Sequence, residues 1–222
     1  MENSVVIKIF SEDVQEKISD IIDNQTNISF EISTKNKETK LKITSNEKDV
    51  IQVYMDKIKE RFGDCIFATE DISLEEVVSK MIIKNNMTLS VAESCTGGMV
   101  SSTFINYPGI SSIFYEGVVT YSNEAKIDRL GVKKESLDKY GAVSEVVAKE
   151  MAQGLKTDIG ISTTGIAGPG GGTLEKEVGL VYIGICINDN TTVKKYNFKG
   201  SRDEIRLSAT KNAINDLRLR LL

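Results

Sequence analysis

The sequence has 222 residues, of which 40% are hydrophobic and 27% are charged, and its net charge is −4. These values are typical of a globular chain that is long enough for one large domain or two modest ones. The acidic balance argues against nucleic acid as a partner, and no apolar run is long enough to span a membrane. The first residues lack the features of a signal peptide, so we expect a cytoplasmic protein that binds neither nucleic acid nor membrane.

Two residue types narrow the possible chemistry. The sequence contains no histidine, which excludes Ser-His-Asp and Cys-His catalysis and nearly all zinc sites. Its three cysteines, at positions 65, 95 and 186, form neither a disulfide framework nor a zinc spacing. Any proton transfer must therefore use Lys, Tyr, Asp, Glu or water.

The first part of the chain, residues 1–70, is predicted to form a small two-layer α+β domain. In order, the predicted elements are a strand over 5–10, a helix from Ser11, strands around 28–32 and 41–43, and a helix from Asn46 to Gly63. This βαββα module contains no cluster of catalytic residues, and we interpret it as a docking or dimerisation module. A short connection over 64–71 follows it.

Residues 71–222 are predicted to form a three-layer α/β/α domain with a mostly parallel, mixed sheet. The predicted elements are helices from Ser73, Met99, Asn123, Ser144 and Ser201, strands at 87–92, 116–121, 159–164, 178–187 and 191–198, and a polar connection over 132–140. The two closing strands follow one another without a helix, and for this reason the sheet is predicted to be mixed.

The segment AESCTGG (92–98) ends a buried apolar run and opens a helix. Several polar side chains and two glycines follow one another here: Glu93, Ser94, Cys95, Thr96, Gly97 and Gly98. Backbone N–H groups at a helix start are unpaired, and glycines allow a ligand to approach them closely. Alternatively, a hydroxyl of this segment only caps the helix. The residues alone leave both interpretations open.

Three of the predicted strands end in polar, glycine-bearing or capped turns, at 94–98, 121–126 and 163–173. If these strands are parallel neighbours, the turns converge on one edge of the sheet. Lys126 lies in the first turn of a helix, where the helix dipole and burial would lower its pKa. The dipole alone is insufficient for a lysine base, so a desolvated pocket would be needed. An exposed surface lysine is the other interpretation.

Further candidates lie towards the C-terminus. Arg202 and Arg206 are four residues apart at the positive end of the last helix, where a bound anion would offset their charge; surface carboxylates are the alternative partners. The loop 165–173 contains five glycines and a proline, and it either wraps a phosphate or base with its amides or only connects two strands. Cys95 is a rival nucleophile to Ser94, although a buried cysteine also packs as a hydrophobe.

Four motifs of the second domain have a specific order and spacing: AESCTGG (92–98), VTYSNEAK (119–126), GAVSE (141–145) and TGIAGP (164–169). In these motifs the sequence from Ser73 onward resembles the CinA C-terminal domain family, whose stand-alone members are nicotinamide-nucleotide amidohydrolases. Residues 5–70 resemble the small middle domain of longer CinA proteins. Those longer relatives carry a further nucleotide-pyrophosphatase domain, whose activity is not carried over to this sequence.

The resemblance implies hydrolysis of the carboxamide of nicotinamide mononucleotide to nicotinate mononucleotide and ammonia. It implies that Ser94 is the nucleophile, that Lys126 and Tyr121 transfer its proton, and that backbone amides after Ser94 hold the oxyanion. The implied substrate-binding residues are Glu93, Thr96, Gly97, Gly98, Thr164, Gly165, Gly168 and Arg202. This scheme requires no metal and no cofactor, its only small-molecule partner is the nucleotide substrate, and the resemblance together with the first module indicates a homodimer.

The sequence departs from the family pattern at two positions near the expected ligand loops. Glu177 stands where the family usually has Pro, and Ser201 stands where it commonly has Asp. A second hypothesis is therefore a non-catalytic nucleotide-sensing or protein-interaction module in a competence or DNA-damage response. A general Ser–Lys peptidase is a weaker hypothesis, because no Ser-x-x-Lys spacing occurs at Ser94.

Overall fold

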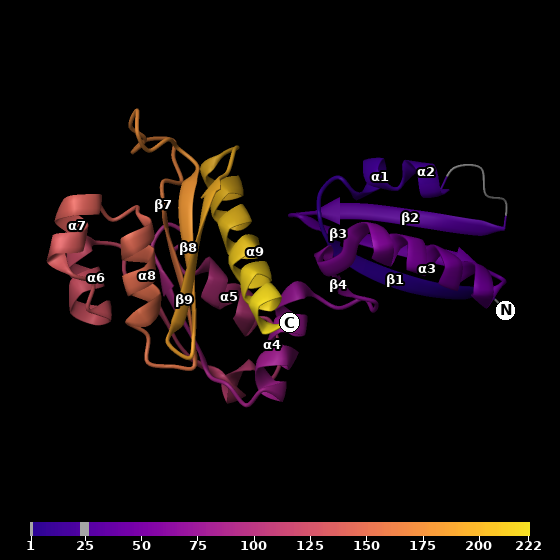
Figure 1. Cartoon of the computed structure of the whole chain (residues 1–222), viewed down its shortest axis with the longest axis horizontal. Helices are drawn as coiled ribbons and strands as arrows, with labels where there is room; N and C mark the ends of the chain where they lie inside the picture. Colours follow the sequence, from indigo (N-terminus) through magenta and orange to yellow (C-terminus); the bar gives the residue numbers. More distant parts are fainter. Residues whose placement is uncertain (1, 23–26) are drawn as a thin grey trace. The chain divides into compact units, whose positions relative to one another are not determined.

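The computed structural model describes residues 2–22 and 27–222, which divide into two compact units, Met1–Val77 and Val78–Leu222. The first unit contains an antiparallel sheet in the order β2-β3-β1-β4 (Figure 1). Its elements are β1 (Asn3–Phe10), α1 (Val14–Lys17), α2 (Ser19–Ile22), β2 (Ile28–Lys35), β3 (Glu38–Ser45), α3 (Lys48–Phe62), the 3-10 turn η1 (Gly63–Cys65) and β4 (Ile66–Ala68).

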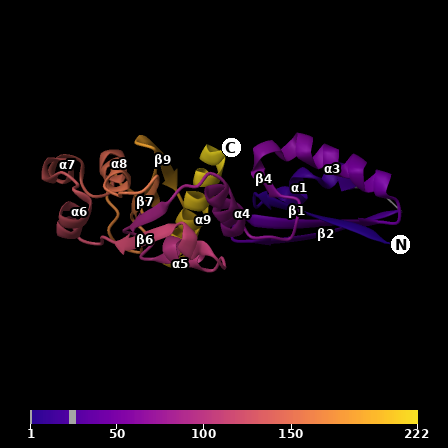
Figure 2. The same ribbon diagram turned by 90° about the horizontal axis from the view of Figure 1, so that it is seen from below.

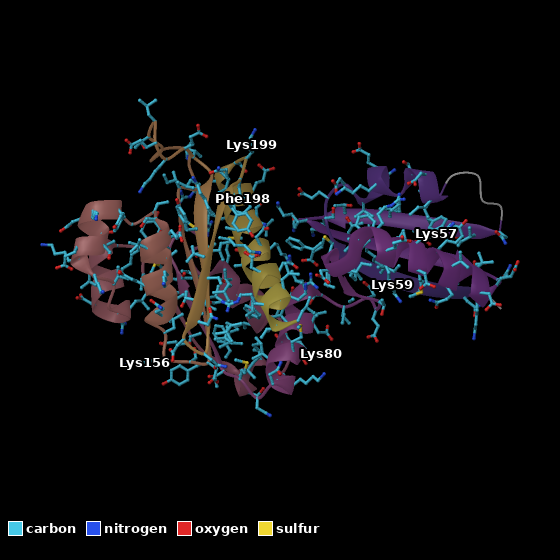
Figure 3. The ribbon with its side chains drawn as sticks, viewed as in Figure 1. Lys57, Lys59, Lys80, Lys156, Phe198 and Lys199 are labelled. Atoms are coloured by element: carbon cyan, nitrogen blue, oxygen red, sulfur yellow. The ribbon has the colours of Figure 1, made fainter. Side chains whose placement is uncertain are left out.

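The alternating pattern of the first unit produces its core. Inward-facing residues of β1 and β3, such as Ile7 and Leu41, are fully buried and belong to one cluster with Ile58 of α3. The exposed side of α3 carries lysines, among them Lys57 and Lys59 (Figure 3). This amphipathic helix closes one face of the sheet, as its spacing predicts.

Two details of the first unit differ from the prediction. The helix expected from Ser11 is divided into α1 and α2, because the hydroxyl of Ser19 donates to the carbonyl of Glu16 at 2.8 Å and competes with helix continuation. The connection expected over 64–71 contains β4, which adds a fourth strand to the sheet beside β1. A strand of three residues is too short to show an alternating pattern.

The second unit contains a five-stranded sheet in the order β6-β5-β7-β8-β9. Its elements, together with α4, which spans the division between the units, are α4 (Leu74–Lys84), β5 (Leu89–Glu93), α5 (Met99–Ile105), the 3-10 turn η2 (Ile110–Ser112), β6 (Phe114–Val119), α6 (Asn123–Leu130), α7 (Lys134–Tyr140), α8 (Glu145–Gln153), β7 (Ile159–Gly165), β8 (Leu180–Ile187), β9 (Asn190–Asn197) and α9 (Arg202–Leu221).

The predicted mixed sheet of the second unit is confirmed. β5 pairs in parallel with both β6 and β7, whereas β8 is antiparallel to β7 and to β9, so four of the five strands run in one direction. Helices α6, α7 and α8 lie on one side of the sheet, and α5 and α9 lie on the other (Figures 1 and 2). The unit is therefore a three-layer α/β/α domain, as predicted.

Glycines let helix α8 approach the sheet closely. A Cβ atom on Gly160 would lie 2.4 Å from the carbonyl oxygen of Ala152, and one on Gly184 would lie 2.7 Å from that of Ala148. The hydroxyl of Ser162 also donates to the Ala148 carbonyl at 2.6 Å. These contacts hold α8 closely against β7 and β8.

Two boundaries of the second unit differ from the prediction. The segment 132–140, expected as a polar connection, contains α7, which buries Leu137 in a cluster with Leu130 and Val147. A helix of this length offers too few apolar positions to show helical spacing. Strand β6 ends at Val119 rather than at residue 121, which leaves Thr120 and Tyr121 in the loop that leads to α6.

Candidate active site

Three loops meet at one edge of the second sheet, as the sequence predicts. They follow the carboxyl ends of β5, β6 and β7, whose parallel pairing aligns Glu93 with Val119 and with Thr163. Backbone hydrogen bonds continue this alignment beyond the strands: Ser94 N–H donates to the Thr163 carbonyl at 2.9 Å, and Thr120 N–H donates to the Glu93 carbonyl at 2.9 Å. The edge is thus a topological crevice of the kind that binds ligands in α/β folds.

The side chain of Lys126 reaches from α6 to Ser94. Its Nζ lies 3.2 Å from Ser94 Oγ and donates to the carbonyls of Thr120 at 2.8 Å and Tyr121 at 3.1 Å. Lys126 is fully buried and Ser94 is 9% exposed. Besides its bond to carbon, Nζ has three tetrahedral positions. Two of them point at the two carbonyls, and the third points at the Ser94 hydroxyl. In the neutral amine that third position can hold the lone pair, which is the geometry that a base for the Ser94 hydroxyl requires.

Burial is the main cause that lowers the pKa of Lys126, because the ammonium loses its hydration. A negative charge on Cys95 would act in the opposite sense. That charge does not arise near neutral pH, since burial raises the pKa of the Cys95 thiol to about 12. The environment thus favours an amine at Lys126 and disfavours a thiolate at Cys95, which weakens the case for cysteine as nucleophile.

A pocket of about 200 Å³ opens beside Ser94. Its walls are Ser94, Cys95, Tyr121, Arg202 and the glycine-rich loop that follows β7. Arg202 Nη1 donates to the Gly168 carbonyl at 2.8 Å, and its Nη2 lies 3.5 Å from the Tyr121 hydroxyl. Tyr121 is 65% exposed, and within the described residues its hydroxyl contacts Arg202 rather than Ser94 or Lys126. The geometry places Tyr121 and Arg202 at the mouth of the pocket.

Hydrogen bonds hold the segment between β7 and β8, which includes the glycine-rich loop. Gly165 and Gly168 line the pocket, and Gly168 has a positive φ of 76°. Three residues after this loop, Lys176 Nζ donates to the carbonyls of Tyr140 at 2.6 Å and Val143 at 2.8 Å. The end of the sheet that carries this loop also carries Phe198, whose N–H donates to the Gly179 carbonyl at 2.9 Å (Figure 3). The loop is therefore more than an unsupported connector.

Glu93 does not face the pocket, contrary to its expected role in substrate binding. It is fully buried, and its carboxylate accepts from the N–H groups of Gly98 at 2.9 Å, Val100 at 3.1 Å and Ser101 at 2.8 Å, and from the Ser101 hydroxyl at 2.7 Å. This side chain takes the anion position at the N-terminus of α5. The buried Glu93 carboxylate thus caps the N-terminus of α5, and the N–H of Gly98 is one of the groups that it accepts from.

The two threonines expected at the substrate also lie behind the pocket. Thr96 Oγ1 and Thr163 Oγ1 are 2.7 Å apart, and Thr96 is fully buried. The hydroxyl of Thr164 donates to the Ala142 carbonyl at 2.8 Å. Both threonines stabilise the loops that form the pocket, and neither is among the residues that line it.

Arg206 differs most from its expected role as a partner of Arg202 in anion binding. Its Nε donates to the Cys95 carbonyl at 3.2 Å and its Nη2 to the Thr96 carbonyl at 2.9 Å. Asp203 lies 3.5 Å from Nη1. Sequence reasoning could not find these acceptors, because backbone carbonyls carry no residue signature. The same holds for the carbonyls of residues 120 and 121 that hold Lys126.

The described residues contain no group of three or more His, Cys, Asp or Glu side chains placed to hold a metal ion. None of their helices combines the length and the apolar composition that crossing a bilayer requires.

Comparison with known proteins gives consistent matches. The family model of the CinA C-terminal domain matches residues 71–221. A competence-damage inducible protein of Clostridioides difficile (strain 630) is 52% identical in an alignment that covers 92% of this chain and 53% of that protein. One from Clostridium perfringens (strain 13 / Type A) is 49% identical and covers 98% of this chain and 56% of that protein. The chain thus spans about half the length of the curated relatives it matches.

Solved structures match about two thirds of the chain. A CinA superfamily protein from Klebsiella pneumoniae has a TM-score of 0.65 at 31% identity, covering 67% of this chain and 95% of that one. A CinA superfamily protein from Escherichia coli has a TM-score of 0.64 at 33% identity, covering 67% of this chain and 88% of that one.

Proposed function

This chain belongs to the CinA family, and from that premise we propose that it is an amidohydrolase that converts nicotinamide mononucleotide to nicotinate mononucleotide and ammonia. One observation carries the proposal: Ser94 Oγ lies 3.2 Å from the Nζ of a fully buried lysine in a chain without histidine. A buried amine beside a hydroxyl at the wall of a pocket is an arrangement for nucleophilic catalysis.

In this mechanism the neutral Lys126 takes the proton of Ser94 as Oγ attacks the carboxamide carbon. The carbonyls of Thr120 and Tyr121 hold the amine in place while the proton moves. Lys126 then gives the proton to the nitrogen that leaves as ammonia, and an ester forms on Ser94. Water adds to this ester with Lys126 as the base, which releases the carboxylate and restores the hydroxyl.

The carboxamide oxygen becomes negatively charged in the transition state, and we expect it to lie against backbone amides. Glu93 accepts from the amides of Gly98, Val100 and Ser101, and the amides closer to Ser94 are not in that set. In the proposal these nearer amides stabilise the oxyanion. Thr96 contributes through its backbone alone, because its side chain is buried against Thr163.

The nucleotide is proposed to bind between Arg202 and the glycine-rich loop. Arg202 supplies a positive charge at the mouth of the pocket, where its guanidinium lies between the Gly168 carbonyl and the Tyr121 hydroxyl. Arginine binds phosphate through several N–H groups at once. Tyr121 is assigned a binding role at the same mouth. The resemblance implies that Tyr121 and Lys126 both transfer the proton, and the present proposal assigns this transfer to Lys126 alone.

The test is release of ammonia from nicotinamide mononucleotide by the purified chain and by two neighbouring variants. Ser94→Ala removes the nucleophile, and turnover is expected to vanish. Cys95→Ala removes only a buried thiol and is expected to remain active. A Ser94→Ala variant that releases ammonia at the wild-type rate would refute the mechanism. Binding of the nucleotide by calorimetry without any ammonia would instead favour a nucleotide-sensing module.

A further inference from the structure

The guanidinium of Arg206 bridges two consecutive peptide units of the loop that carries Ser94. Nε donates to the carbonyl of Cys95 and Nη2 to the carbonyl of Thr96. The two residues it holds are more than 100 positions earlier in the chain. Arg206 is not among the residues that line the pocket, so it acts on the loop from behind.

Because peptide units are planar, these two hydrogen bonds also determine the direction of the N–H groups in the same peptides. The peptide bonds on either side of Thr96 are trans, since the only cis bond among the described residues is Gly168–Pro169. In a planar trans peptide the C=O and N–H point in opposite directions. Holding the carbonyls of Cys95 and Thr96 towards Arg206 therefore turns the N–H groups of Thr96 and Gly97 away from it.

One of these N–H groups, that of Thr96, lies beside a residue that lines the pocket. The N–H of Thr96 lies beside the thiol of Cys95, whose pKa it lowers in opposition to burial, and Cys95 lines the pocket. Gly97 keeps space for the guanidinium, because a Cβ there would lie 3.3 Å from Arg206 Nη2. A peptide flip at this loop would present a carbonyl oxygen where negative charge develops.

The position of Arg206 on its own helix offers no competing reason for an arginine. It lies near the N-terminus of α9, where the helix dipole disfavours a cation. Its carboxylate contact, Asp203, is 91% exposed and 3.5 Å away, and an exposed pair of this kind contributes little. The backbone carbonyls are the better-defined partners of this side chain.

We propose that Arg206 is a positioning residue for catalysis, which holds the carbonyls of Cys95 and Thr96 away from the pocket and so presents the following N–H groups to the reacting oxyanion. The inference rests on the proposed function, because it requires that Ser94 attacks a carbonyl group. It adds a residue from the last helix that neither contacts the substrate nor moves a proton.

The test compares Arg206→Met, Arg206→Lys and Arg206→Ala with the matched control Asp203→Asn, which removes the exposed ion pair and leaves the carbonyl contacts. Two rates are measured: ammonia release, with kcat and KM separated, and modification of Ser94 by a fluorophosphonate, which also places an anionic oxygen beside Ser94. Loss of one oxyanion donor lowers kcat by about 100-fold in known enzymes, so we expect a drop of about that size for Arg206→Met.

A positioning role predicts a pattern that loss of stability would not give. KM for Arg206→Met stays near the wild-type value, the fluorophosphonate rate falls in parallel with kcat, and the acid limb of the pH profile stays in place because Lys126 is untouched. Arg206→Lys is intermediate, methylguanidinium partly restores Arg206→Ala, and Asp203→Asn matches the wild type.

The other outcomes are distinguishable. An active wild type with an unchanged kcat in Arg206→Met, or a loss confined to KM, overturns this inference and leaves the proposed function standing. A wild type that fails to release ammonia but reacts with the fluorophosphonate removes the proposed substrate, and the labelling rates still decide the role of Arg206. A wild type inert to both reagents removes both proposals.

Discussion

Charged side chains of the two units bind different kinds of partner. In the first unit they mostly pair with one another at the surface, as Lys42 does with Glu31 at 2.8 Å and Lys17 with Asp13 at 2.9 Å. Around the pocket of the second unit they bind backbone groups instead. Lys126 and Arg206 donate to carbonyls, and Glu93 accepts from amides.

The charged groups of the first unit are thus exposed to solvent, whereas those near the pocket hold the backbone of its loops in place. An exposed ion pair contributes little, because water and salt screen it. A buried charge is costly unless its hydrogen bonds are satisfied, so each backbone partner near the pocket fixes the conformation of a loop. The second unit therefore uses charge to hold Ser94 and its surroundings, and the following substitutions probe that contrast.

The largest expected effect is that of Lys126→Met, which removes the base and keeps an unbranched apolar side chain. General base catalysis contributes up to about 10⁴-fold, and we expect ammonia release to fall by that order. The melting temperature should change little, because the fold no longer desolvates an amine but the carbonyls of Thr120 and Tyr121 lose their donor. A variant that keeps more than a tenth of the wild-type rate would contradict the assignment of Lys126 as the base.

Glu93→Gln is expected to have the next largest effect. The amide offers one acceptor oxygen where the carboxylate serves four donors, and leaving a buried donor unsatisfied costs about 1–3 kcal/mol. Urea unfolding of the full chain measures this loss. The matched control is Glu31→Gln in the first unit, which leaves an exposed lysine and is expected to give no measurable change. Equal effects of both variants would remove the contrast between the units.

The pH dependence of the second unit follows from the lowered pKa of Lys126. The base must be neutral, so kcat/KM should rise about tenfold per pH unit below that pKa and level off above it. Stability changes in the same direction. Between the lowered folded pKa and the ordinary unfolded pKa, the unfolded chain binds the extra proton, and stability rises with pH. Lys126→Met should lack this rise in urea unfolding measured across the window.

The sequence predicts those parts of the fold and site that depend on spacing or on residue type. Alternation and helical spacing identify the strands and helices that build both cores, and the turns after β5, β6 and β7 converge as expected. The family resemblance names Ser94 and Lys126, and the structure brings their side chains within 3.2 Å of each other. Helix α7 and strand β4 are missed because elements of that length do not show a period.

The rest of the site could not be predicted, because it depends on side-chain direction and on backbone acceptors. Glu93 follows a strand in a motif that indicates ligand binding, yet its side chain turns inward to cap α5. Arg206 has the charge and spacing of an anion ligand together with Arg202, and its acceptors are carbonyls in a distant segment. Neither direction is encoded in a local pattern of residue types.

The smallest expected effect is the coupling between Lys42 and Glu31, on neighbouring strands of the first unit. The Lys42 ammonium lowers the pKa of Glu31, and Glu31 raises that of Lys42, but both side chains are exposed. A double-mutant cycle of Lys42→Met and Glu31→Gln in urea unfolding is expected to give a coupling near the error of the measurement. Any coupling should shrink as salt is added, and it should be lost as the pH falls through the lowered pKa of Glu31. A large coupling that survives high salt would show that the first unit, too, depends on charge for its shape.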